Sequence, residues 1–413
     1  LPPHSGYHGA IASPFEPFFE GWYLRITPTQ EDWEGGSLAF IFHVFDPQQT
    51  RSKRKGVGLQ VLTPNEDIGT IVVESSDTSG FRADPHNLDI KNKFVSGGNK
   101  KTKLFEGDDF FDLTARRLKG RASSSSIPAS VGSSSCTIDF DFELIPEIGW
   151  GGGDRSRQYS TAGWLASFPV FEPHYQILIS DGIANGFLRI QSSGSSNNGE
   201  DETTTRTQQH EYNLKDAKVY LEKNWGSSFP SKWWWIQANA FPSENKLCVT
   251  STGAKRRVPL ANQEEEVALV GIHYKGQFLP FPAVDWTVEW GRWEIVGTYE
   301  DYRVKLTGSC TDDGMYVRCP TPDGMKETAL ETYRGKLRVE LYQSNILLVD
   351  ETTDNACLEI GGLPWKNDEK GEKSRACWKG RSSMMEPIGD IVMNPDLERF
   401  GSDVIQFVGN FIN

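Results

Sequence analysis

The chain has 413 residues, of which 37% are hydrophobic and 24% charged, a composition typical of a folded protein with two ordinary domains. Its formal net charge of −13 repels phosphate backbones, so we predict no nucleic-acid partner. No stretch approaches the roughly 20 consecutive apolar residues of a membrane-spanning helix, which excludes such a span.

Alternation of apolar and polar residues runs along much of the chain and predicts β-strands. The runs 39–45 and 267–272 are more apolar, so we expect strands that are buried on both faces. Residues 138–144, 302–307 and 336–341 alternate apolar with polar or charged side chains, which predicts antiparallel strands with one wet face. The 40 Gly and 22 Pro that punctuate such runs are typical of barrels or sandwiches built from many short strands.

Two polar stretches and one helical pattern complete the organisation. Residues 123–135 and 192–209 are rich in Ser, and the second also in Thr, Asn and Gly, so both are expected to be surface insertions. We divide the chain into domains 1–225 and 226–413. Near the C-terminus, apolar residues at spacings of three and four predict an amphipathic helix over 394–411, which packs against a barrel or lies on a membrane surface.

Four segments combine aromatic rings with a few ionisable side chains, at 4–8, 18–25, 162–174 and 222–237. A carboxylic acid among aromatic rings loses solvation and holds its proton more tightly, so it can donate that proton to a weakly basic group. Aromatic rings also stabilise a developing carbocation by about 0.5–2 kcal/mol each. The pattern therefore predicts a site that protonates an alkene.

The same segments allow a structural interpretation. In it, Glu20 and Arg25 form an ion pair at a barrel mouth, and Glu222 and Lys223 lie on a loop. Only some of the tryptophans at 233–235 can face a cavity, because successive strand residues point to opposite sides. The sequence contains no GxxxxGK[ST], HExxH or GxSxG motif, and we predict neither a metal ion nor a cofactor.

At these segments the sequence resembles the tocopherol cyclases of plants, algae and cyanobacteria. The matching stretches are HSGYH at 4–8, FFEGWYLR at 18–25, STAGWLASFPVFEPHYQI at 160–177, EKNWGSSFP at 222–230 followed by WWWIQANAF, and EIGGLPW at 359–365. They stand in the family's order and span nearly the whole chain. More distantly, the arrangement is similar to the carotenoid 1,2-hydratase group, whose two domains resemble lipocalins and whose reaction also begins with protonation of an isoprenoid double bond.

Together with the strand pattern, the resemblance implies an all-β fold of two tandem lipocalin-like antiparallel β-barrels, with few helices and a hydrophobic cavity near their junction. The implied activity is that of a tocopherol cyclase, which closes the chroman ring from a phytyl-type benzoquinol by alkene protonation and phenol attack. The resemblance also implies a plastid location and peripheral association with a thylakoid or plastoglobule lipid surface. The chain starts at Leu1 without a recognisable transit peptide, so its own residues leave the location open.

Membership of these motifs selects the candidate residues. For the acid we expect Glu172 or Glu222 first and Glu20 after them, with His174 orienting the acid or collecting the phenolic proton. The expected contacts with the quinol, its tail and the cation are Trp164, Trp225, Asn224, Tyr23, Arg25, Tyr7, His8, Trp22, Phe171 and Trp234. Two alternatives stay open: a lipocalin-like protein that binds prenylquinones, carotenoids or other lipids without turnover, and an isoprenoid hydratase that yields an open-chain tertiary alcohol.

Overall fold

In the part of the chain that the structure describes, all the regular elements are β-strands, which confirms the all-β prediction. The computed structural model describes residues 2–12, 15–30, 33, 36–49, 52–64, 69–94, 108–124, 135–154, 157–161, 163, 173–196, 204–227, 229–242, 246–258, 263–362, 365 and 377–383. The helix predicted over 394–411 lies outside these ranges. Within them, no helix has the length and apolarity that crossing a bilayer requires.

The first sheet contains the strands of the N-terminal half. They are β1 (Phe19–Thr27), β2 (Leu38–Phe45), β3 (Gly56–Leu62), β4 (Thr70–Ser75), β5 (Arg82–Ala83), β6 (Asp89–Lys93), β7 (Phe110–Thr114), β8 (Arg117–Ser124), β9 (Ser135–Ile148), β10 (His174–Ile179), β11 (Asp181–Ser196) and β12 (Thr204–Gly226). Their hydrogen-bonded order is β4-β3-β2-β1-β12-β11-β9-β8-β7-β6-β5, and β10 pairs with β12. Neighbouring strands are antiparallel, as the alternating sequence predicted.

The second sheet begins after a short connection. Its strands are β13 (Lys232–Ala238), β14 (Cys248–Val258), β15 (Gln263–Tyr274), β16 (Gln277–Phe281), β17 (Ala283–Glu289), β18 (Arg292–Tyr299), β19 (Tyr302–Ser309), β20 (Met315–Thr321), β21 (Gly324–Gln343), β22 (Ile346–Gly361) and β23 (Trp378–Ser383). The order is β16-β15-β14-β13-β22-β21-β19-β18-β17-β23, with β20 pairing with β21. This sheet is also antiparallel.

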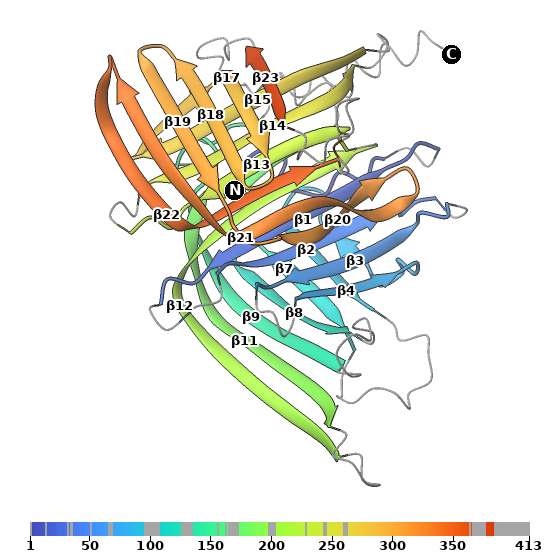
Figure 1. Cartoon of the computed structure of the whole chain (residues 1–413). Helices are drawn as coiled ribbons and strands as arrows, with labels where there is room; N and C mark the ends of the chain where they lie inside the picture. The colour runs from blue at the N-terminus through green and yellow to red at the C-terminus, as the bar shows by residue number, and fades with distance from the viewer. Residues whose placement is uncertain are drawn as a thin grey trace, which may run out of the picture.

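The five runs predicted as strands lie within β2, β9, β15, β19 and β21, and every residue of β2 is buried. Within the expected surface insertion, residues 192–196 of β11 and 204–208 of β12 pair as an arm (Figure 1). Pairing between antiparallel strands uses backbone groups, so a sequence without apolar side chains can still extend the ladder beyond the body of the sheet.

Both sheets curl, so that strands distant in the ladder approach each other: β4 lies against β8, and β15 against β23 (Figure 1). The hydrogen-bonded order of each sheet is an open path, so the described strands form two open, barrel-like sheets. Apolar side chains fill both interiors, with Phe40 against Phe140 in the first and Trp234 against Trp286 in the second.

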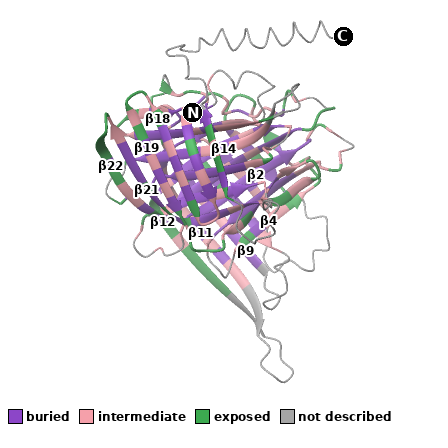
Figure 2. Cartoon of the chain, turned by 45° about the horizontal axis from the view of Figure 1, so that its top comes forward, coloured by how far each residue is buried: buried purple, intermediate pink, exposed green. Residues whose placement is uncertain are grey.

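Where the two sheets meet, their strands are buried on both faces. Figure 2 shows buried residues along the centre of the molecule and exposed ones toward the far ends of β12 and β22. On β1, Leu24 belongs to the interior of the first sheet, whereas Tyr23 packs in the layer between the sheets. On β13, Trp234 belongs to the interior of the second sheet, whereas Trp233 and Trp235 pack in that layer. The period of two along a strand therefore separates core residues from interface residues.

One buried guanidinium, that of Arg25 on β1, joins the two sheets. Its Nη1 donates to the carbonyl of Gln237 on β13 at 3.1 Å, and its Nη2 donates to the hydroxyl of Ser37 at 2.7 Å. Arg25 also donates to the side-chain oxygen of Gln237 and to the carbonyl of Asn355 on β22. The planar fork of an arginine can serve several acceptors at once, so Arg25 fixes β1 against β13 and β22.

The hairpin of β20 and β21 forms a second connection, because it reaches from the second sheet onto the first and lies beside β1–β3 (Figure 1). Gln60 on β3 donates to the carbonyl of Arg318 at 2.8 Å and accepts the backbone N–H of Arg318 at 3.0 Å. The Arg318 guanidinium also pairs with Glu74 on β4 at 2.8 Å. This hairpin closes one side of the space between the sheets.

We expect Arg25→Ala to lower the free energy of unfolding by about 3–5 kcal/mol, because several buried acceptors lose their donor. Urea denaturation followed by tryptophan fluorescence measures the loss. The matched control is Arg338→Ala, which removes an exposed pair with Asp350 and should leave the midpoint nearly unchanged. Equal midpoints for the two variants would contradict the role of Arg25 between the sheets.

Candidate active site

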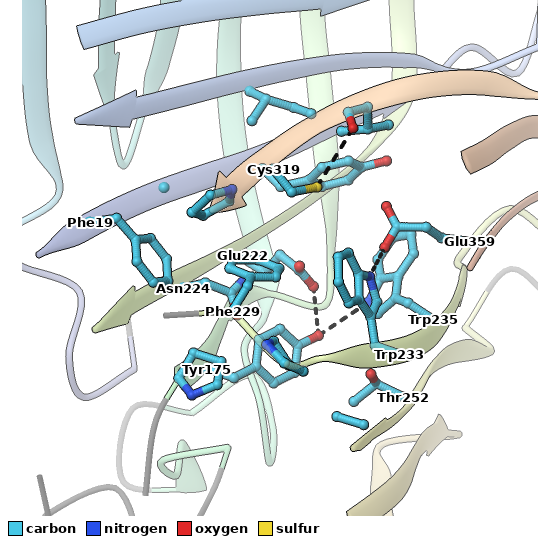
Figure 3. A pocket seen from close by; sticks show the side chains of 18 of the residues that line it. Phe19, Tyr175, Glu222, Asn224, Phe229, Trp233, Trp235, Thr252, Cys319 and Glu359 are labelled. Atoms are coloured by element: carbon cyan, nitrogen blue, oxygen red, sulfur yellow. Dashed lines mark hydrogen bonds between the residues drawn. The ribbon is translucent and has the colours of Figure 1, made fainter. Parts of the chain in front are cut away.

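A cavity lies in the layer between the two sheets and holds about 210 Å³ of space for water-sized molecules. Its walls come from β1, β2, β10 and β12 of the first sheet and from β13, β14, β15, β20 and β22 of the second (Figure 3). Most of the lining is aromatic or aliphatic, including Phe229, Trp233 and Trp235. Two carboxyl groups, those of Glu222 and Glu359, are part of it.

Glu222 is held by phenol hydroxyl groups. Its Oε2 accepts one hydrogen bond from Tyr175 on β10 and one from Tyr220 on β12, each at 2.6 Å. The indole N–H of Trp235 donates to the Tyr175 hydroxyl at 3.3 Å, which extends the network to the second sheet (Figure 3). Burial raises the pKa of Glu222 to about 7, although both hydroxyl bonds act in the opposite direction.

Glu359 stands on β22, directly opposite Glu331 of β21 in the strand register. The indole N–H of Trp233 donates to Glu359 Oε1 (Figure 3). The two oxygens of Glu331 accept hydroxyl bonds from Tyr23 at 2.6 Å and from Tyr333 at 2.7 Å. Burial raises the pKa of Glu331 to about 7, and burial together with the neighbouring Glu331 raises the pKa of Glu359 well above its ordinary value.

Glu20 has a different environment, on the face of β1 that turns away from the cavity. Its Oε1 lies 2.5 Å from Lys223 Nζ, and both side chains are fully buried. Its Oε2 accepts the backbone N–H of His8 at 2.8 Å and that of Gly9 at 3.3 Å. Burial alone would raise the pKa of Glu20, but the lysine and His8 outweigh it and lower the pKa. Glu20 is therefore ionised and holds the N-terminal segment against the sheet.

Trp225 stacks between two imidazole rings on that same side of the sheet. The ring of His8 lies 4.1 Å from it and that of His174 lies 5.0 Å from it, both nearly parallel. The Lys223 ammonium lies 4.8 Å from the Trp225 ring. Burial is the main cause that lowers the pKa of His174 to about 4, so this imidazole is neutral at pH 7.

The sequence profile described as tocopherol cyclase-like matches residues 16–362 of the chain. The chain belongs to the tocopherol cyclase-like family. A relative from Zea mays named "Tocopherol cyclase, chloroplastic" is 31% identical, over 95% of this chain and 82% of the relative. A second chloroplastic relative, from Oryza sativa subsp. japonica, is 28% identical over 94% of this chain and 83% of the relative.

Two solved structures show a loose likeness. A Nitrosomonas europaea protein described as AttH is 13% identical, with a TM-score of 0.46, over 88% of this chain and 97% of that one. Kievitone hydratase from Nectria haematococca is also 13% identical, with a TM-score of 0.37, over 87% of this chain and 97% of that one.

In this member of the tocopherol cyclase-like family, the residues selected from the motifs fall into three groups. Those that line the cavity are Glu222, Asn224, Tyr23 and Trp22. Those that lie elsewhere in the described structure are Glu20, Tyr7, His8, His174, Trp225, Arg25 and Trp234. Those that lie outside the described residues are Trp164, Phe171 and Glu172.

Alternation along the strands explains this separation within single motifs. On β12, Glu222 and Asn224 face the cavity, whereas Lys223 and Trp225 face the other side. Trp234, which we expect at the substrate, instead packs inside the second sheet because its two neighbours on β13 take the cavity side. The motif at 359–365 contains Glu359, but a matching motif does not indicate which of its members faces a cavity.

Lys223→Met removes the cation beside Glu20 and leaves a buried carboxylate without a partner. We expect it to lower the free energy of unfolding by about 3–5 kcal/mol. The double variant Glu20→Gln, Lys223→Met removes both charges and should recover most of that loss. Chemical denaturation of the three proteins measures the coupling, and equal losses in the single and double variants would show that no such pair exists.

Proposed function

We propose that this protein cyclises a prenylated benzoquinol to a chroman, the reaction of a tocopherol cyclase. The observation that carries the proposal is an aromatic cavity between two sheets with two carboxyl groups in its lining, whose pKa values burial raises, to about 7 for Glu222 and well above the ordinary value for Glu359. Protonation of an alkene needs an acid that remains protonated, a surrounding that excludes water, and rings that face the cation. The maize relative's name supports the same reaction.

The reaction balances within one substrate molecule. A proton is added to one carbon of the trisubstituted alkene, a phenol oxygen forms a bond to the other, and the phenolic proton leaves. Trp233, Trp235 and Phe229 provide rings beside the cation. Because the head and the alkene are held in one cavity, ring closure is intramolecular and has a large advantage in effective concentration.

Among the carboxyl groups expected from the motifs, Glu222 lines the cavity in the described structure, so we assign it a role in proton transfer. Asn224 and Tyr23 lie on the same wall and suit the hydroxyl groups of the quinol head. The tail then extends along aliphatic residues such as Leu269 and Val317. This orientation keeps the polar head near polar groups and buries the tail in apolar surroundings.

The setting of the reaction is part of the proposal. Both plant relatives carry the word chloroplastic in their names, which supports a plastid location for this chain. A prenylated quinol dissolves in lipid, so we expect the protein to meet its substrate at a thylakoid or plastoglobule surface. Fractionation of plastids with an antibody to the protein tests this, and recovery from the stroma alone would contradict it.

Incubation of the purified protein with a phytyl-type benzoquinol should yield a chroman, identified by chromatography and mass spectrometry. Glu222→Gln should reduce kcat by at least about 100-fold, because the amide cannot exchange a proton while it keeps the shape of the side chain. The control is Glu340→Gln, since Glu340 is another buried carboxyl that accepts a tyrosine hydroxyl, from Tyr342 at 3.0 Å.

Two other outcomes would replace the proposal. Recovery of bound but unchanged quinol from the wild-type protein would indicate a lipid-binding protein without turnover. An open-chain tertiary alcohol as the product would indicate an isoprenoid hydratase, in which water rather than the phenol captures the cation.

A further inference from the structure

Two carboxyl groups reach the same cavity from different sheets. Glu222 comes from β12 of the first sheet, and Glu359 comes from β22 of the second (Figure 3). Glu222 is buried, and Glu359 is half-buried at the cavity wall. A cyclisation needs one group that donates a proton and one that accepts a proton, so a cavity with two carboxyl groups can supply both.

The hydrogen-bond donors around the two groups differ. Glu222 Oε2 accepts two phenol hydroxyl bonds, from Tyr175 and Tyr220. Such bonds favour the ionised form of a carboxyl. Among the described residues, the donor to Glu359 is the indole N–H of Trp233. The surroundings therefore suit a carboxylate at Glu222 and a neutral acid at Glu359.

A neighbouring carboxyl keeps the proton on Glu359. Glu331 stands opposite Glu359 in the β21–β22 register, and residues paired in this way place their Cβ atoms about 4.5–5.5 Å apart. Two carboxylates at that separation repel each other, so when one is ionised the pKa of the other is raised. Glu331 takes the charge because Tyr23 and Tyr333 donate to it and the positive charge of Arg25 lowers its pKa. Glu359 therefore retains a proton.

We propose that Glu359 is the acid that protonates the alkene, that Glu222 accepts the phenolic proton, and that Glu331 is a positioning residue for Glu359. The assignment rests on the proposed cyclisation and reverses the role that we expected for Glu222 from its motif. The Glu359 O–H bond breaks as a C–H bond forms on the alkene. The phenol O–H bond breaks as its oxygen bonds to the cationic carbon, and the proton passes to Glu222.

The cycle is complete when the proton returns from Glu222 to Glu359, and the substrate undergoes no net gain or loss of protons. Donor and acceptor stand on different sheets and line the same cavity. Neither sheet alone contains both groups.

Other ionisable groups lie around the two carboxyl groups, and their protonation also contributes to the pH dependence of activity. The cavity lining also contains His43, Arg256, Arg318, Tyr175 and Cys319. Arg318 is paired with Glu74 at 2.8 Å and Arg256 with Glu265 at 2.5 Å. Burial lowers the pKa of His43 to about 3, so it stays neutral over the range in which Glu222 titrates.

The pH profile of kcat/KM distinguishes the two assignments of Glu222. Because an acceptor must be ionised, activity should rise as the pH increases through about 7, the pKa of Glu222. If Glu222 were the donor, activity would fall through the same range. Tyr220→Phe removes one hydroxyl donor to Glu222, so its pKa should increase and the rising limb should move by about 0.5–1 pH unit to higher pH.

A falling limb near pH 7 that moves in Tyr220→Phe would assign the donor role to Glu222 and overturn the proposal. A rising limb of the kcat/KM profile that stays at the same pH in Tyr220→Phe would also overturn the proposal, because Glu222 would then not be the titrating group. Among the described residues, Tyr175 lines the cavity and Tyr220 does not, so Tyr220→Phe is the hydroxyl deletion next to Glu222 that removes no atom from the cavity lining.

Glu359→Gln tests the donor directly, because the amide can still accept the Trp233 N–H but holds no acidic proton. We expect kcat to fall at least about 100-fold with little change in KM, while Glu340→Gln keeps wild-type values. Full activity of Glu359→Gln would overturn this inference alone. A wild-type protein that makes no chroman would instead overturn the proposed function.

Glu331→Gln tests the positioning role. Loss of the adjacent negative charge should lower the pKa of Glu359, so the decline of activity at alkaline pH should begin at a lower pH than in the wild-type protein. A residue with only a structural role would change stability or overall rate without moving this limb. An unchanged limb would remove Glu331 from the assignment.

Discussion

Burial of carboxyl groups between two β-sheets is the constraint on which the site depends. A carboxyl removed from water must receive a cation, receive hydrogen bonds or keep its proton. Glu20 is paired with Lys223 and is ionised, whereas Glu222, Glu331 and Glu359 receive phenol and indole donors and have raised pKa values. The same residue type is therefore structural on one face of the first sheet and fit for proton transfer on the other.

Tyrosine and tryptophan suit this layer because each combines a large apolar ring with one hydrogen-bond donor. Trp233 and Trp235 line the cavity with their rings and direct their N–H groups to Glu359 and Tyr175. The same side chains thus exclude water, offer ring faces to a cation and fix the carboxyl groups. Apolar side chains fill the interiors of both curled sheets. The proposed proton-transfer site therefore lies between the sheets and not inside either of them.

The two sheets have to pack against each other before the site exists. Glu222 and its two tyrosines belong to the first sheet, and Glu359 with Trp233 belongs to the second. Arg25 and the hairpin of β20 and β21 hold the sheets in a fixed relation, so they determine the distance between the proposed donor and acceptor. Stability of the sheet interface and activity are therefore expected to be linked through these connections.

The sequence by itself determined the strands and the family, because the alternation of side chains is a local property and the motifs are continuous in the chain. Its motifs also identified Glu222, Asn224 and Tyr23 as candidates, and all three line the cavity. Only the tertiary structure decided which side each motif residue faces, and it joined Glu20 to Lys223 across 203 positions. Glu331 and Glu359 gained their significance only in that packing, since the proton affinity of a carboxyl depends on the groups that surround it in space.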